Sequence, residues 1–114
     1  MITHVVLLEP KGSWSAEQQR AILDAIDAVV RGCPTVRACR IGRRVLHGLA
    51  GYEQTMRDDY QFALMLDFDD AEGLRAYLTH PQHAAIGGFF TSAAARSLAY
   101  DYQMMDAEQA RTAI

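Results

Sequence analysis

The chain has 114 residues, the length of a single domain. Half of the residues are hydrophobic and 22% are charged, a composition that excludes an intrinsically disordered protein. The formal net charge of −3 argues against a general nucleic-acid-binding protein, and no apolar run is long enough to span a membrane. Because the first residues lack the positive start and cleavage site of a signal peptide, we expect a cytoplasmic protein.

The N-terminal third of the chain predicts a strand followed by a helix. Residues Ile2 to Leu8 form a short apolar run that ends before a proline and a glycine, which is typical of a strand. Ser15, followed three residues later by Gln18, is a capping box that begins a helix. The helix ends at Gly32 and carries an apolar stripe formed by Ile22, Ile26, Val29 and Val30.

The middle of the chain predicts two strands joined by a loop. Residues Thr35 to Val45 form the first strand, although several arginines interrupt its apolar pattern. Residues His47 to Asp59 contain glycines and polar side chains and predict the loop. Tyr60 to Phe68 is the clearest strand of the chain, with apolar side chains at both odd and even positions.

A helix in two pieces is predicted after this strand. Asp69 and Asp70 can cap the first piece, Ala71 to Thr79. Pro81 interrupts it, because its ring disfavours helical geometry at His80 and it has no backbone N–H. The second piece runs from Gln82 to Ala95, where two glycines weaken it.

The last strand is predicted over Ser97 to Met104, and the polar tail over 107–114 is expected to fray. Residues 1–106 therefore form the domain. Its order of elements, β-α-β-β-α-β, predicts an α+β ferredoxin-like fold with a four-stranded antiparallel sheet and both helices on one face.

Both faces of this sheet are apolar. Neighbouring strand residues point to opposite faces, and one face holds Val6, Leu8, Phe62, Leu64 and Leu66 while the other holds Val5, Leu7, Ala63 and Met65. The helices cover only one face, and soluble monomers rarely leave so large an apolar surface open. We therefore expect a homodimer joined sheet to sheet.

The sequence contains no cofactor or metal motif. Cys33 and Cys39 match neither a CxxC redox motif nor a zinc site, so they are expected to be reduced thiols. There is no nucleotide-binding, hydrolase or zinc-protease signature. We expect no cofactor, no metal, no nucleic acid and no membrane partner.

Four segments resemble the stress-responsive dimeric α/β-barrel (Dabb) family: MITHVVLL, YQFALMLDFDD, GLRAYLTHPQH and LAYDY. The resemblance extends from Ile2 to about Asp106 and is most specific at residues 60–83, which end in an HPxH block. It implies a ferredoxin-like protomer whose sheet forms a barrel with that of a second copy. The wider superfamily includes cofactor-independent monooxygenases and proteins similar to muconolactone isomerase.

The resemblance also implies site residues. The best understood Dabb enzyme is a plant polyketide cyclase that makes olivetolic acid by an aldol condensation. Its catalytic histidine and tyrosine correspond to His83 and Tyr77, and a histidine of its pocket corresponds to His4. A further pocket histidine is replaced here by Phe62, which puts the same substrate in doubt.

The spacing of residues supports a pocket between helices and sheet. Helical periodicity turns Tyr77 toward the sheet and puts His83 on one stripe with Ile86 and Phe90. With Pro81 as the first helical residue, His83 is the third, where the helix dipole keeps the imidazole neutral as a general base requires. The expected substrate-binding residues are His4, Val6, Phe62, Leu64, Ile86 and Phe90. The alternative is a structural role, in which both side chains only bond to backbone at the helix break.

Two further groups of polar residues have open roles. His80 is expected to turn outward and cap the restarted helix. Arginines crowd residues 31–44 and either attract an anionic ligand or stand solvated on an edge strand.

The sequence therefore predicts a homodimer that binds a small carbonyl-bearing or aromatic metabolite. In the enzymatic interpretation it is a cofactor-independent cyclase, isomerase or lyase in which His83 removes a proton and Tyr77 polarises a carbonyl. The alternative is a non-catalytic stress-response or ligand-sequestering protein.

Overall fold

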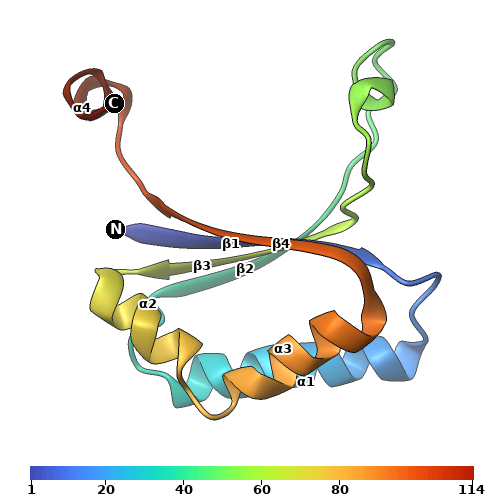
Figure 1. Ribbon diagram of the computed structural model, residues 1–114, viewed down its shortest axis with the longest axis horizontal. Coiled ribbons are helices and arrows are strands. Elements are labelled where there is room, and N and C mark those ends of the chain that lie inside the picture. Colours follow the sequence, from blue (N-terminus) through green and yellow to red (C-terminus); the bar gives the residue numbers. More distant parts are fainter.

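Four antiparallel strands form one sheet in the order β2-β3-β1-β4, and three helices cover one of its faces (Figure 1). The computed structural model describes residues 1–114. The strands are β1 (Ile2–Pro10), β2 (Ala38–Arg43), β3 (Phe62–Phe68) and β4 (Ala94–Gln103). The covering helices are α1 (Ala16–Gly32), α2 (Ala71–Leu78) and α3 (His83–Ala93). The predicted ferredoxin-like α+β fold is confirmed.

The C-terminal tail differs from the prediction, because it forms a helix, α4 (Ala107–Ala113), rather than fraying. Asp106 accepts a hydrogen bond from the backbone N–H of Gln109, and the Gln109 side chain accepts one from the N–H of Asp106. This is the same capping box that opens α1 at Ser15, so the sequence contained the signal.

Several strand boundaries also differ. β1 continues to Pro10 and β3 begins at Phe62, and the two larger differences concern β2 and β4. β2 is shorter than the predicted Thr35 to Val45, since only Ala38–Arg43 pairs with β3. β4 begins at Ala94, directly after α3, because Ala94 pairs with Pro10 beyond an irregularity in the register at Glu9. Both boundaries depend on a partner strand and not on the local pattern.

The two faces of the sheet are as the strand alternation predicts. Val6, Leu8, Leu64 and Leu66 are buried beneath the helices, and they form the core with Ile22, Ile26, Val29 and Ile86. Val5, Leu7, Ala63 and Met65 lie on the other face and stay half-buried in the single chain. The segment between β2 and β3, with the short helix η1 (Glu53–Thr55), and α4 both rise on this uncovered side (Figure 1).

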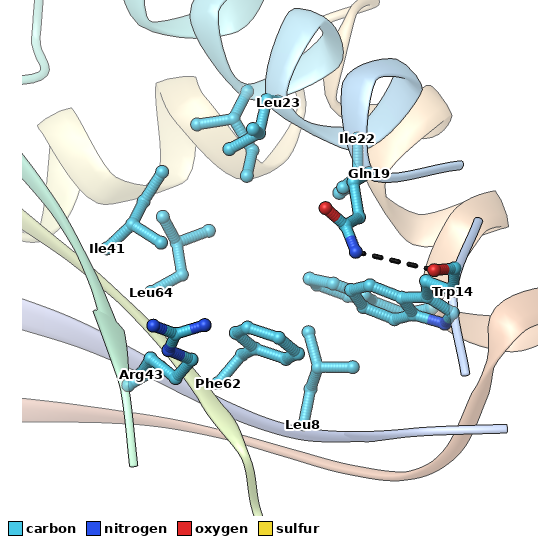
Figure 2. A pocket seen from close by; sticks show the side chains of 12 residues that line it. Leu8, Trp14, Gln19, Ile22, Leu23, Ile41, Arg43, Phe62 and Leu64 are labelled. Carbon is cyan, nitrogen blue, oxygen red and sulfur yellow. Dashed lines mark hydrogen bonds between the residues drawn. The ribbon is translucent and has the colours of Figure 1, made fainter. Parts of the chain in front are cut away.

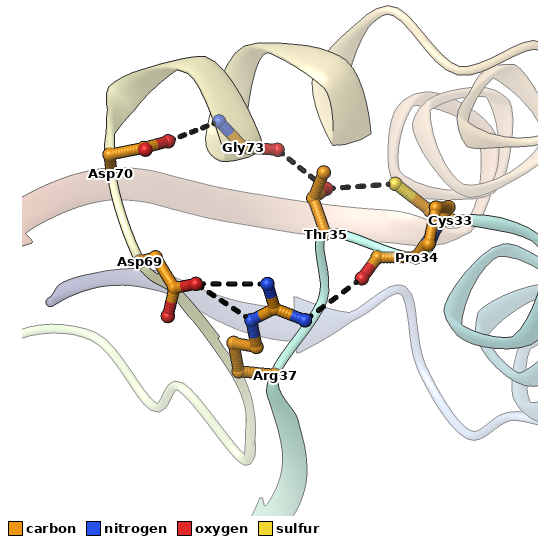
Figure 3. A network of polar contacts seen from close by, with 7 residues as sticks. All are labelled: Cys33, Pro34, Thr35, Arg37, Asp69, Asp70 and Gly73. Atoms are coloured by element: carbon orange, nitrogen blue, oxygen red, sulfur yellow. Dashed lines mark hydrogen bonds and ion pairs between the residues drawn. The ribbon is translucent and has the colours of Figure 1, made fainter.

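A polar network holds the start of α2 against the end of α1 (Figure 3). Thr35 donates a hydrogen bond to the carbonyl of Gly73 (2.8 Å), and the N–H of Gly73 donates to the Asp70 carboxylate (2.8 Å). A Cβ at Gly73 would lie 3.3 Å from the Cβ of Thr35, so the approach requires a small residue. The network fixes the first turn of α2 and thereby the position of Tyr77, one turn later.

No helix has the length and apolar character that crossing a membrane requires.

Candidate functional site

Three aromatic side chains from three elements meet beneath α2 and α3: His4 from β1, Tyr77 from α2 and His83 from α3. The ring centroids of His4 and Tyr77 are 5.7 Å apart, those of Tyr77 and His83 are 4.9 Å apart, and both pairs are edge-on. Tyr77 is only 1% exposed and His4 only 5%, whereas His83 is half-buried. The structure thus brings the three predicted polar site residues together in one row.

His83 is the first residue of α3, and not the third as predicted. Gln82 is the N-cap residue, and Pro81 lies in the turn that links α2 to α3. The backbone N–H of His83 donates to the carbonyl of His80 at 3.0 Å. His83 therefore still lies at the positive end of the helix dipole.

Burial shifts the pKa values of Tyr77 and His83. It lowers the pKa of His83, and the nearby His4 lowers it further. Burial also raises the pKa of Tyr77 above its ordinary value. At pH 7 the pair is a neutral imidazole beside a neutral phenol, which can respectively accept and donate a proton.

Asp101 orients His4, and sequence reasoning missed it. The Nδ1 of His4 lies 2.6 Å from a carboxylate oxygen of Asp101 on β4. An ionised carboxylate accepts a hydrogen bond from the Nδ1–H of an imidazole, which fixes the orientation of the ring. The two residues are 97 positions apart and meet only because they are partners in the β1–β4 register.

His80 joins the turn between α2 and α3 to α1. Its Nδ1 accepts the N–H of Gln82 at 3.2 Å, and its Nε2 lies 3.2 Å from the carbonyl of Gly32. The ring of His80 thus contacts backbone groups at the end of α1 and at the start of α3, which is a structural role.

We expect His80→Ala to cost about 1 kcal/mol of unfolding free energy, since a capping interaction is lost. Ligand binding should not change, because His80 belongs neither to the row of His4, Tyr77 and His83 nor to the lining of the cavity between α1 and the sheet. Thermal denaturation and ligand titration of the variant test both expectations. A loss of binding without a loss of stability would contradict the structural role.

A cavity of about 310 Å³ opens between α1 and the sheet (Figure 2). Its lining residues are Leu8, Trp14, Gln19, Ile22, Leu23, Ile26, Ile41, Arg43, Phe62, Ala63, Leu64 and Phe90. The indole of Trp14 is stacked on the ring of Phe62, with centroids 5.4 Å apart and planes 6° from parallel. The volume is at the lower end of the range for small-molecule sites.

Trp14 is the lining residue that sequence reasoning missed. It directly precedes the N-cap Ser15, and its indole N–H donates to the carbonyl of Ala93 at 2.9 Å. A hydrophobic staple would pair this position with an apolar residue in the first turn of the helix. Here that residue is Gln19, so the sequence pattern did not reveal where the indole packs.

The predicted substrate-binding residues are divided between the cavity and the core. Phe62, Leu64 and Phe90 line the cavity. Val6 and Ile86 are fully buried and lie between the cavity and the row of His4, Tyr77 and His83. On β1, Val6 separates His4 from Leu8, and on α3, Ile86 separates His83 from Phe90, two turns further on.

No group of three or more His, Cys, Asp or Glu side chains is arranged to hold a metal ion. Cys33 and Cys39 are both free thiols, and burial raises the pKa of Cys39. Cys33 is buried and lies 3.1 Å from the hydroxyl of Thr35.

The chain is similar to several solved structures of one fold. A dimeric ferredoxin-like protein of unknown function from Thermobifida fusca YX is 24% identical, with a TM-score of 0.69 over 90% of each chain. A hydroxynitrile lyase from Passiflora edulis is 13% identical, with a TM-score of 0.76 over 92% of this chain and 94% of that one. The cofactor-independent oxygenase SnoaB from Streptomyces nogalater is 13% identical, with a TM-score of 0.68 over 92% of this chain and 93% of that one.

At these identities the similarity shows the fold alone, and no curated protein matches the chain. Residues 2–104 do match the family described as Stress responsive A/B Barrel Domain, Dabb. The match covers nearly the whole chain and includes β1, the β3–α2 segment and the HPxH block. The protein belongs to the Dabb family.

Proposed function

We propose that this protein binds a small carbonyl-bearing or aromatic metabolite in the cavity between α1 and the sheet. The observation that carries this proposal is the cavity itself, whose wall contains the stacked rings of Trp14 and Phe62. An apolar, concave site with few polar groups is the usual form of a small-molecule site. The stack offers a flat apolar surface on which a planar ligand gains favourable contact.

Ile41→Trp tests this function. Ile41 is 51% exposed at the wall of the cavity, so a larger side chain there fills the site without disturbing the core. We expect ligand affinity, measured by calorimetry against a metabolite library, to fall by at least about 10-fold, since a filled site leaves no space for the ligand.

Leu78→Trp is the matched control, because Leu78 is a partly exposed residue of α2 that does not line the cavity. This variant should bind like the unaltered protein. Equal affinity in the Ile41 variant would exclude the cavity as the binding site.

An enzymatic version of this function is supported by the neutral imidazole of His83 beside the neutral phenol of Tyr77. In this version His83 removes a proton adjacent to a carbonyl and Tyr77 polarises that carbonyl, as in a cofactor-independent cyclase, isomerase or lyase. His4, held by Asp101, positions Tyr77 through their ring contact. The hydroxynitrile lyase and the oxygenase above have the same fold.

The competing function is non-catalytic sequestration of the ligand. It is supported by the burial of Val6 and Ile86, which separate the cavity from His83. Catalysis requires the reacting end of the ligand to pass between Val6 and Ile86 and reach His83. Sequestration requires no movement of these two side chains. Turnover by the unaltered protein therefore distinguishes the two versions.

A second copy of this chain is the proposed cover of the open sheet face. On β4, Tyr100 and Tyr102 lie on this face and are 56% and 52% exposed. The segments that rise on this side carry further exposed apolar residues, namely Val45, Leu46, Leu49, Tyr52, Met56 and Met104. A surface of this size favours association.

A further inference from the structure

The polar side chains that line the cavity differ in whether their hydrogen-bond donors are already engaged. The indole N–H of Trp14 donates to the carbonyl of Ala93. The amide nitrogen of Gln19 donates to the carbonyl of Trp14 at 3.3 Å, as Figure 2 shows. Arg43 is the third lining residue with donors, and its guanidinium has no partner within the chain. Gln19 keeps one further amide N–H, so Arg43 supplies most of the free donors of the cavity and the only charged ones.

Arg43 differs in this respect from the other arginines of its segment. Arg31 pairs with Asp27, Arg37 with Asp69, and Arg44 with Asp59. Arg40 points to the opposite face of the sheet, since its register partner is Met65. Arg43 pairs in register with Phe62, so it lies on the face that the helices cover. Figure 2 shows its side chain extending from β2 toward Phe62 and Leu64.

An unpaired guanidinium against an apolar wall selects the charge of a ligand. Its planar fork binds a carboxylate through two parallel hydrogen bonds, and such charge-assisted bonds are stronger than neutral ones. The Arg43–Phe62 side of the cavity thus favours an anionic group, while the remaining wall favours an apolar body. No acidic residue lines the cavity to compete for the guanidinium.

We propose that the cavity binds a small carboxylate, in which Arg43 contacts the carboxylate and an aromatic or alkyl body lies against Trp14 and Phe62. This inference rests on the proposed function, because it specifies the class of ligand for the same cavity. It also makes Arg43 the residue that determines specificity for the anion.

Matched acid and amide pairs test this specificity. Phenylpropanoate and naphthylacetate, each with its primary amide, differ within a pair only in charge and head group. Trp14 is the single tryptophan of the chain and lines the cavity, so its fluorescence reports binding of the phenyl pair, and calorimetry reports binding of both pairs. We expect each acid to bind about 10-fold or more tightly than its amide, and increasing salt should weaken the acid alone.

Arg43→Gln should remove the preference for the acid and leave amide binding unchanged. Arg43→Lys should retain part of the preference, since the charge remains but the bidentate geometry is lost. Arg20→Gln is the matched control, because it removes one positive charge from α1 at an exposed residue that does not line the cavity. This control should keep the full preference.

The possible results separate this inference from the proposed function. If acid and amide bind equally, or if Arg43→Gln keeps the preference while Ile41→Trp weakens both ligands, the cavity binds ligands but Arg43 does not select them. That result overturns the inference alone. If no pair binds to the unaltered protein, both the inference and the cavity function are overturned.

Discussion

Met65→Asp is expected to prevent the formation of the dimer. Met65 lies near the centre of the open face, on β3, between strands β1 and β2. In a sheet-to-sheet dimer the new carboxylate would be buried without a partner, which costs several kcal/mol. Light scattering coupled to size-exclusion chromatography should give a dimer mass for the unaltered protein, and a monomer or an unfolded chain for the variant.

Two further variants separate the interface from the stability of the protomer. Tyr100→Glu introduces a charge on the same face at a side chain that is exposed in the single chain, so the protomer should fold and only association should be lost. Ala84→Asp introduces the same kind of charge on the exposed surface of α3 and should leave the dimer intact. A folded dimer of the Tyr100 variant would contradict the proposed interface.

His83→Ala is expected to abolish turnover in the enzymatic version of the proposed function. His83 is the only half-buried group of its row, so its removal takes away the base with little loss of packing. Because burial lowers the pKa of His83, the active, neutral form persists as pH falls through the ordinary histidine value. Activity should decline only at more acidic pH, and a steady-state pH profile measures this.

The lowered pKa of His83 should also make the free energy of unfolding decrease at acidic pH. His83 binds a proton more readily in the unfolded chain than in the folded protein, so its contribution to stability is present above the ordinary pKa of about 6.5 and is lost as pH falls through the lowered value. His83→Ala should remove this dependence. Thermal denaturation of both proteins across this pH range provides the comparison.

Tyr77→Phe is the matched variant for the hydroxyl. It retains the ring contacts of Tyr77 with His4, Phe68 and His83 and removes only the phenol oxygen. Turnover should fall by about 10²-fold or less, since one polarising donor is lost. If His83→Ala instead lowers the melting temperature by several degrees and the unaltered protein turns over no ligand, the row is structural and the enzymatic version is wrong.

Local patterns were sufficient to predict the fold. Ser15 caps α1 as predicted, and Asp70, one of the two predicted caps, begins α2, because a cap is decided within four residues. The alternation in β1 and β3 predicted which side chains the helices bury, because successive strand residues point to opposite faces. The order of the predicted elements was enough to predict the antiparallel sheet, and the HPxH block was enough to predict the family.

The arrangement of the site was decided by the tertiary structure alone. Asp101 reaches His4 through the pairing of the first and last strands, and Trp14 reaches Phe62 across the space beneath α1. Val6 and Ile86 separate His83 from the cavity, which the stripe of His83, Ile86 and Phe90 on a single helix could not reveal. Sequence periodicity gives the direction of a side chain from its own element, whereas the identity of its neighbours depends on how elements distant in the chain pack together.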